Sequence, residues 1–155
     1  MEYDLARFSG NGRVPSLGDI LKNVVPTSTE TTRGKEVFIF RPQIFKETKG
    51  IIFPNDDIIS LRNPYDVIVN NLSVKREKGF LILSEIYHEF SIGDIFPVKI
   101  SGRSTKHNPM FQLFGFFGFV NSGELEVGQK VYVRVRKMKE GLRDNILETE
   151  LYSYI

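Results

Sequence analysis

Apolar residues recur at every second position in a series of short runs, and this period constrains the fold more than any other feature of the sequence. Each run is rich in β-branched or aromatic residues, and Gly, Pro or Asn residues lie between the runs, which are residues 36–40, 65–69, 79–83, 94–100, 111–120 and 130–138. Such runs are typical of strands. Short strands between turn residues favour small barrels over a sheet with alternating helices. We therefore expect an all-β body.

Residues 1–35 are rich in Gly, Ser, Thr and Asn, which favours an open chain, and we expect a flexible N-terminal arm. One island inside it has helical spacing. Ser16 and Asp19 form a capping-box pattern and Pro26 marks the end of the predicted short helix, whose apolar face consists of Leu17, Ile20, Leu21, Val24 and Val25. So short a helix is marginal alone, and we expect it to dock on the body or on a protein partner.

The two halves of the body resemble each other. Val67 and Val69 fall on Val131 and Val133, and residues 85–87 (Glu-Ile-Tyr) fall on residues 150–152 (Glu-Leu-Tyr). Upstream, residues 49–55 resemble residues 115–121. This similarity predicts a tandem pair of related barrels, residues 36–90 and 91–155.

The second half also has the pattern of a known family. The pattern begins with Gly93. A glycine and a hydrophobic strand that ends in Phe-Val occupy residues 115–120. Residues 127–130 are Val-Gly-Gln-Lys, and valines then alternate at 131, 133 and 135. In these features it resembles a TRAM domain, a small oligonucleotide-binding-type (OB) β-barrel of RNA-modifying enzymes and stand-alone archaeal proteins. The resemblance implies an OB-like fold and RNA binding. The family commonly has a glycine-rich turn where this chain has Lys-His-Asn-Pro at 106–109.

The strand expected at 130–138 has one apolar face and one aromatic and basic face. Its valines point one way, which leaves Tyr132, Arg134 and Arg136 on the other side. A ring beside an arginine suits single-stranded nucleic acid, because bases stack on the ring and the cation neutralises phosphate. A solvated strand face would have the same composition.

The phenylalanines of the run 111–120 cannot all fit inside a small barrel. If the run is one strand, Phe114 and Phe116 share a side with Gln112, which predicts that they lie on the wet face. Phe117 and Phe119 are then predicted to be core, and a bulge at Gly115 would reverse the assignment. Burial of the whole cluster is the competing interpretation.

The loop at 101–108 adds basic, hydroxyl and amide groups suited to phosphate, although an ordinary polar hairpin would look the same. Lysines of the first barrel are offset by acidic residues, so binding is expected mainly in the second. The predicted nucleic-acid-binding residues are Lys99, Arg103, Lys106, His107, Phe114, Phe116, Tyr132, Arg134, Arg136 and Lys137.

Composition narrows the function classes. The 155 residues include no cysteine and two histidines, and no phosphate-binding glycine loop or nucleophile elbow is present, so we expect no catalytic site, metal site or cofactor. No apolar run is long enough for a membrane span or has the flanks of a secretory signal, and the lack of cysteine fits a reducing cytoplasm. The net charge of +2 does not by itself imply a polyanionic partner.

These observations predict a non-enzymatic protein that binds single-stranded or structured RNA, ribosomal RNA included, as an RNA chaperone or a ribosome-associated factor. The alternative is a protein-interaction subunit of a larger transcription or translation assembly, which binds through its exposed aromatic residues and its arm.

Overall fold

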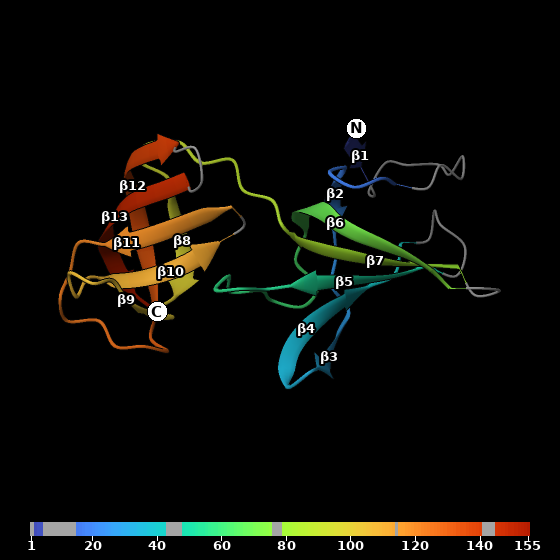
Figure 1. The fold of residues 1–155 in the computed structure, drawn as a ribbon, viewed down its shortest axis with the longest axis horizontal. Coiled ribbons are helices and arrows are strands. Elements are labelled where there is room, and N and C mark those ends of the chain that lie inside the picture. The colour runs from blue at the N-terminus through green and yellow to red at the C-terminus, as the bar shows by residue number, and fades with distance from the viewer. Residues whose placement is uncertain (1, 5–14, 43–47, 76–78, 114, 141–144) are drawn as a thin grey trace. The chain divides into compact units, whose positions relative to one another are not determined.

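A computed structural model describes residues 2–4, 15–42, 48–75, 79–113, 115–140 and 145–155 (Figure 1). These residues form β-strands and no helix, so the all-β prediction is confirmed for the described part of the chain. No helix among them is long and apolar enough to cross a membrane.

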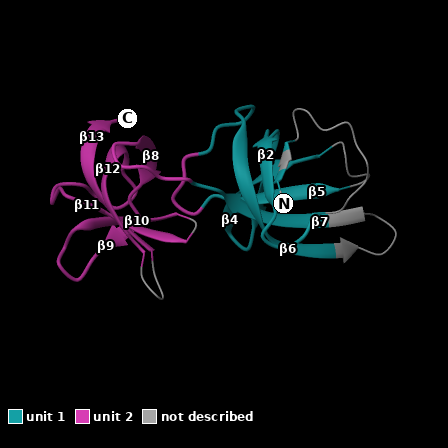
Figure 2. Ribbon diagram, turned by 90° about the horizontal axis from the view of Figure 1, so that it is seen from above, with its two compact units in different colours: residues 1–54, 59–88 teal, residues 55–58, 89–155 magenta. Residues whose placement is uncertain are grey.

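The chain divides into two compact units (Figure 2). The first unit comprises residues 1–54 and 59–88, and the second comprises residues 55–58 and 89–155. The main boundary between the two units therefore lies between His88 and Glu89. Residues 55–58 are an exception: they come directly after residue 54 of the first unit along the chain, but they belong to the second unit.

The first unit is built on one sheet with the order β1-β2-β6-β7-β5-β4-β3. Its strands are β1 (Glu2–Asp4), β2 (Ile20–Val24), β3 (Ser28–Thr32), β4 (Lys35–Phe40), β5 (Lys49–Phe53), β6 (Tyr65–Lys75) and β7 (Gly79–Ile86). β1 pairs with β2 and β5 with β7 in parallel, and the other pairs are antiparallel.

The second unit has a sheet of order β8-β12-β13-β11-β10-β9. Its strands are β8 (Ile95–Lys99), β9 (Gly102–Arg103), β10 (Pro109–Leu113), β11 (Phe116–Val120), β12 (Lys130–Glu140) and β13 (Asn145–Tyr154). β8 and β9 are at opposite edges, yet only Ile100 and Ser101 separate them. The sheet must therefore curl until its edges approach each other, and Ser101 N donates to Met110 O at 2.9 Å where they meet.

The predicted helix over 17–25 is wrong, because Ile20–Val24 form β2. The apolar spacing of three between the buried Leu21 and Val24 comes from an irregularity in the pairing with β6, where Asn23 has a φ of 58°. Ser16 and Asp19 form a turn instead of a helix cap: Asp19 Oδ2 accepts from Ser16 N at 2.6 Å. The predicted arm thus contains β2 and β3, two strands of the first sheet.

The two sheets repeat one topology. If β2 to β7 are matched in order with β8 to β13, the strand orders coincide, and the parallel pair β5–β7 corresponds to β11–β13. The corresponding strands β6 and β12 both shift register at the equivalent point, after Val69 and after Val135. The predicted internal repeat is therefore present in the fold.

The entry turns of the two units also match in sequence and hydrogen bonding. Ser-Leu-Gly-Asp-Ile at 16–20 corresponds to Ser-Ile-Gly-Asp-Ile at 91–95. Gly18 N donates to Val69 O at 2.8 Å and Gly93 N donates to Val135 O at the same distance. The glycines have φ of 83° and 93°, a conformation that disfavours other residues.

These bonds correct part of the predicted alignment. Val69 corresponds to Val135, so the predicted match with Val133 is shifted by two residues. The match of 49–55 with 115–121 is shifted by the same amount, since Gly50 corresponds to Gly118. The predicted match of residues 85–87 with 150–152 agrees with the register of both sheets.

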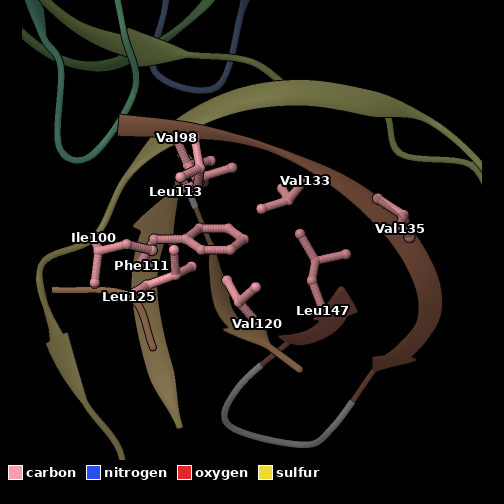
Figure 3. Close-up of a cluster of buried hydrophobic side chains, with 10 residues drawn as sticks. Val98, Ile100, Phe111, Leu113, Val120, Leu125, Val133, Val135 and Leu147 are labelled. Carbon is pink, nitrogen blue, oxygen red and sulfur yellow. The ribbon is translucent and has the colours of Figure 1, made fainter. Parts of the chain in front are cut away.

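Each unit places a phenylalanine ring across a glycine on the neighbouring strand. A Cβ atom on Gly50 would lie 2.2 Å from the Phe40 ring, and one on Gly118 would lie 2.0 Å from the Phe111 ring. The second core gathers around the fully buried Phe111, with Val133, Val135 and Leu147 across the curled sheet (Figure 3).

The predicted sides of the phenylalanines are wrong because 111–120 is a hairpin of two strands. Leu113 pairs with Phe116 across a two-residue connection containing Gly115, whose φ is 68°. Paired residues share a face, so Phe116 lies on the side of the buried Leu113 and packs against the core, edge-on to Phe90 at 5.0 Å. Phe117 and Phe119 lie on the other side and are half-buried. Phe114 is outside the described residues.

Candidate nucleic-acid interface

The outer face of the second sheet, the side away from Phe111, is defined by rows of paired residues. One row runs from Lys137 through Glu148 and Phe119 to Met110, and crosses β12, β13, β11 and β10. A second pairs Ile95, Arg134 and Glu150 across β8, β12 and β13. This face therefore carries an aromatic ring, cations and carboxylates side by side.

A pocket of about 310 Å³ opens on this face. Phe119 contributes the aromatic wall, and the polar groups are a guanidinium, two carboxylates and two amides. Its lining is Asn108, Phe119, Val120, Asn121, Arg136, Glu148, Thr149 and Glu150. Thr149 is buried and its hydroxyl donates to Phe119 O at 2.8 Å, which fixes β13 against β11 at the pocket floor.

Arg136 reaches the pocket from a β-bulge. The pairing of β12 with β13 passes from Val135–Thr149 to Lys137–Glu148, so Arg136 is the extra residue without a partner in the register. Bulges commonly redirect one side chain beside a functional site. The bulge thus lets Arg136 and Lys137 point to the same side of the sheet.

The charges on this face are largely paired. Glu150 forms an ion pair with Arg134 at 3.6 Å and accepts a hydrogen bond from Arg136 at 3.3 Å, and Glu148 Oε1 lies 3.5 Å from Lys139 Nζ. Pairs this exposed contribute little to stability. Their effect is to orient the side chains and to offset the positive charge that the sequence predicted for β12.

Three tyrosines form the second aromatic feature of this unit. Tyr132, Tyr152 and Tyr154 are exposed by 38%, 53% and 58%, and they are the exposed aromatic residues of the described chain. The Arg134 guanidinium carbon lies 4.9 Å from the Tyr152 ring centroid, a cation–π arrangement. The predicted residues Tyr132, Arg134 and Arg136 therefore lie on one face, as expected from the alternation.

Arg103 has a structural role. Its guanidinium donates to the carbonyl oxygens of His107 at 3.0 Å, Gly123 at 3.3 Å and Leu125. These bonds tie the 104–107 turn to the β11–β12 connection. The predicted phosphate contact by Arg103 would compete with this bracing.

The remaining predicted site residues are exposed but spread out. Lys106 and His107 lie at the tip of a tight turn closed by His107 N donating to Ser104 O at 2.8 Å. Lys99 is exposed near the end of β8, opposite Lys130, and Lys137 is exposed on β12. Phe116 is not part of this face.

Sequence reasoning missed Phe119, Asn121, Glu148, Glu150 and Tyr152 as site residues. The alternation of Ile146, Glu148, Glu150 and Tyr152 along β13 was available as a signal for its outer face. No group of three or more potential metal ligands is found among the described residues. Comparisons with protein-family models, curated proteins and solved structures find no match to this chain.

Proposed function

We propose that the chain is a non-enzymatic RNA-binding protein whose second unit binds single-stranded RNA on the outer face of β10 to β13. The observation that carries the proposal is the pocket on this face, which is lined by Phe119 of β11 and by Arg136 at the bulge of β12. An aromatic ring offers a stacking surface to a base, and an adjacent arginine neutralises the phosphate.

The sheet topology supports this choice of face. Counting β8 and β9 as one bent strand, the second unit is a curled five-stranded sheet in which β10 and β11 are the second and third strands. In an OB-fold, the face of strands two and three and the adjoining loops bind oligonucleotides. The TRAM-like sequence pattern agrees with such a barrel, and an RNA chaperone or a ribosome-associated factor fits this architecture.

The tyrosines extend the same surface. Tyr132 and Tyr152 flank Arg134 on β12 and β13, so a strand of RNA leaving the pocket would meet further stacking surfaces. Each stacked base contributes about 1–3 kcal/mol, so two or three rings suffice for measurable binding.

A second function, docking of a protein in a transcription or translation assembly, is favoured by aliphatic residues at the surface of this unit. Ile92 and Ile155 are each 62% exposed, and Ile95 is 42% exposed beside Arg134. Such residues suit a protein contact better than a phosphate backbone.

Titration of the whole chain with fluorescent single-stranded RNA at low and moderate salt tests the proposal. Arg136→Ala should weaken binding and lower the slope of log affinity against log salt by about 0.7, because one phosphate contact is lost. Arg41→Ala, which removes the same charge from the first unit, is the matched control and should bind as the parent does. Absence of salt-dependent binding by the parent would overturn the proposal and leave protein docking.

A further inference from the structure

We infer that the pocket selects guanine, with Glu148 as the residue that reads the base. This inference rests on the proposed function, since it names the base that the RNA would place there. Glu148 and Phe119 are direct partners in the parallel pairing of β13 with β11. A base stacked against the Phe119 ring would therefore present its edge to the Glu148 carboxylate.

The pocket is large enough to admit one base. Its volume of about 310 Å³ lies at the lower end of the range for small-molecule pockets, about 300–1,000 Å³. Larger ligands would have to extend over the open face towards the tyrosines.

The carboxylate determines which base is favoured. An ionised carboxylate only accepts hydrogen bonds, through two oxygens side by side. Guanine offers two adjacent donors, N1–H and the N2 amino group. Adenine and cytosine each place an acceptor beside a single amino group, and uracil places carbonyl oxygens on both sides of N3–H, so these bases bring acceptors towards Glu148.

The remaining polar groups of the pocket fit this orientation. Asn108 and Asn121 carry amide donors suited to O6 and N7 of guanine. Glu150 is held by Arg134 and Arg136, whereas Glu148, within the described part of the chain, forms an ion pair with Lys139 through Oε1, and its side chain is 47% exposed. A carboxylate has about four acceptor positions, so Glu148 retains the capacity for a base edge.

Comparison with the first unit indicates that the fold itself does not require these residues. By register, Leu83 occupies the position of Glu148 and Ile51 the position of Phe119. On a surface that binds phosphate, an unneeded carboxylate would only repel the ligand. Its presence at the pocket is explained by recognition of a base with two donors.

Oligouridine probes of about nine nucleotides, with a central guanosine, inosine, adenosine or uridine, test the inference by fluorescence anisotropy. The parent should bind the guanosine probe on the order of tenfold more tightly than the inosine probe, which lacks the N2 amino group. Glu148→Gln should abolish this preference without weakening binding of the uridine probe. The matched control Glu126→Gln, an exposed carboxylate outside the pocket lining, should keep it.

The outcomes separate this inference from the proposed function. If the parent binds all four probes equally, or if Glu148→Gln retains the guanosine preference, guanine reading is wrong and RNA binding stands. If Glu148→Gln strengthens binding of all probes by one factor and keeps their ratios, the carboxylate acts only through charge, which also overturns the inference. Failure of the parent to bind any probe would overturn the proposed function itself.

Discussion

The two units share one topology but differ in the face that lies opposite the core cluster formed around Phe40 or Phe111. In the first unit, Val37, Ile39 and Ile51 on this face are buried in a second apolar cluster with Leu81 and Leu83. In the second unit, the matching positions of Ile51 and Leu83 are Phe119 and Glu148, which line a polar pocket. The repeat thus conserves the residues that shape the sheet, and the outer face has become a core in one unit and a candidate binding surface in the other.

The contact between glycine and phenylalanine should be essential in both units, and this is the largest effect that we expect. Gly50→Ala and Gly118→Ala should each destabilise their own unit by about 3 kcal/mol, because the added Cβ overlaps a buried ring. Amide hydrogen exchange on the buried strands of each unit measures the two effects separately.

A smaller side chain in place of the phenylalanine should relieve the clash with the added Cβ atom. Phe111→Leu combined with Gly118→Ala should cost less than the sum of the two single changes, and Phe40→Leu with Gly50→Ala should behave alike. Additive losses in either unit would show that its ring does not press on its glycine, and would break the equivalence.

Exchanging the outer-face residues should affect the units in opposite ways. Leu83→Glu should destabilise the first unit by about 2 kcal/mol, because it places a carboxylate in the apolar cluster. Glu148→Leu should change the stability of the second unit by less than about 0.5 kcal/mol, because Glu148 is exposed. Denaturant unfolding followed by amide hydrogen exchange measures the change in unfolding free energy of each unit. Equal losses would mean that the two faces do not differ in burial.

The strand content and the repeat could be predicted from the sequence because both depend on local patterns. Alternation identified β4, β6, β7 and β12, and residues 85–87 could be matched to 150–152 directly. The helix prediction failed because the pairing irregularity between Leu21 and Val24 imitates helical spacing. The repeated Ser-Leu-Gly-Asp and Ser-Ile-Gly-Asp turns were visible in the sequence and would have corrected it.

The site was harder to predict, because it depends on which side each residue faces after a turn or a bulge. Counting parity through Phe114 and Gly115 as one strand exchanged the roles of Phe116 and Phe119. Arg136 lines the pocket as the alternation predicts, but the bulge that brings Lys137 to the same side of the sheet is contained in no alternation rule. The three carbonyl partners of Arg103 come from loops that the sequence leaves unplaced.

The pair Phe119→Ala and Phe116→Ala, measured for both RNA affinity and stability, distinguishes a ring that stacks on RNA from a ring that packs in the core. Phe119→Ala should weaken binding of single-stranded RNA by about 2 kcal/mol through loss of a stacking surface, with a smaller loss of folding stability. Phe116→Ala should lower the stability of the second unit by about 3 kcal/mol, because the ring packs on the core, and should leave the affinity of the folded protein unchanged. The result that would contradict the account is a Phe119→Ala variant that binds RNA as tightly as the parent.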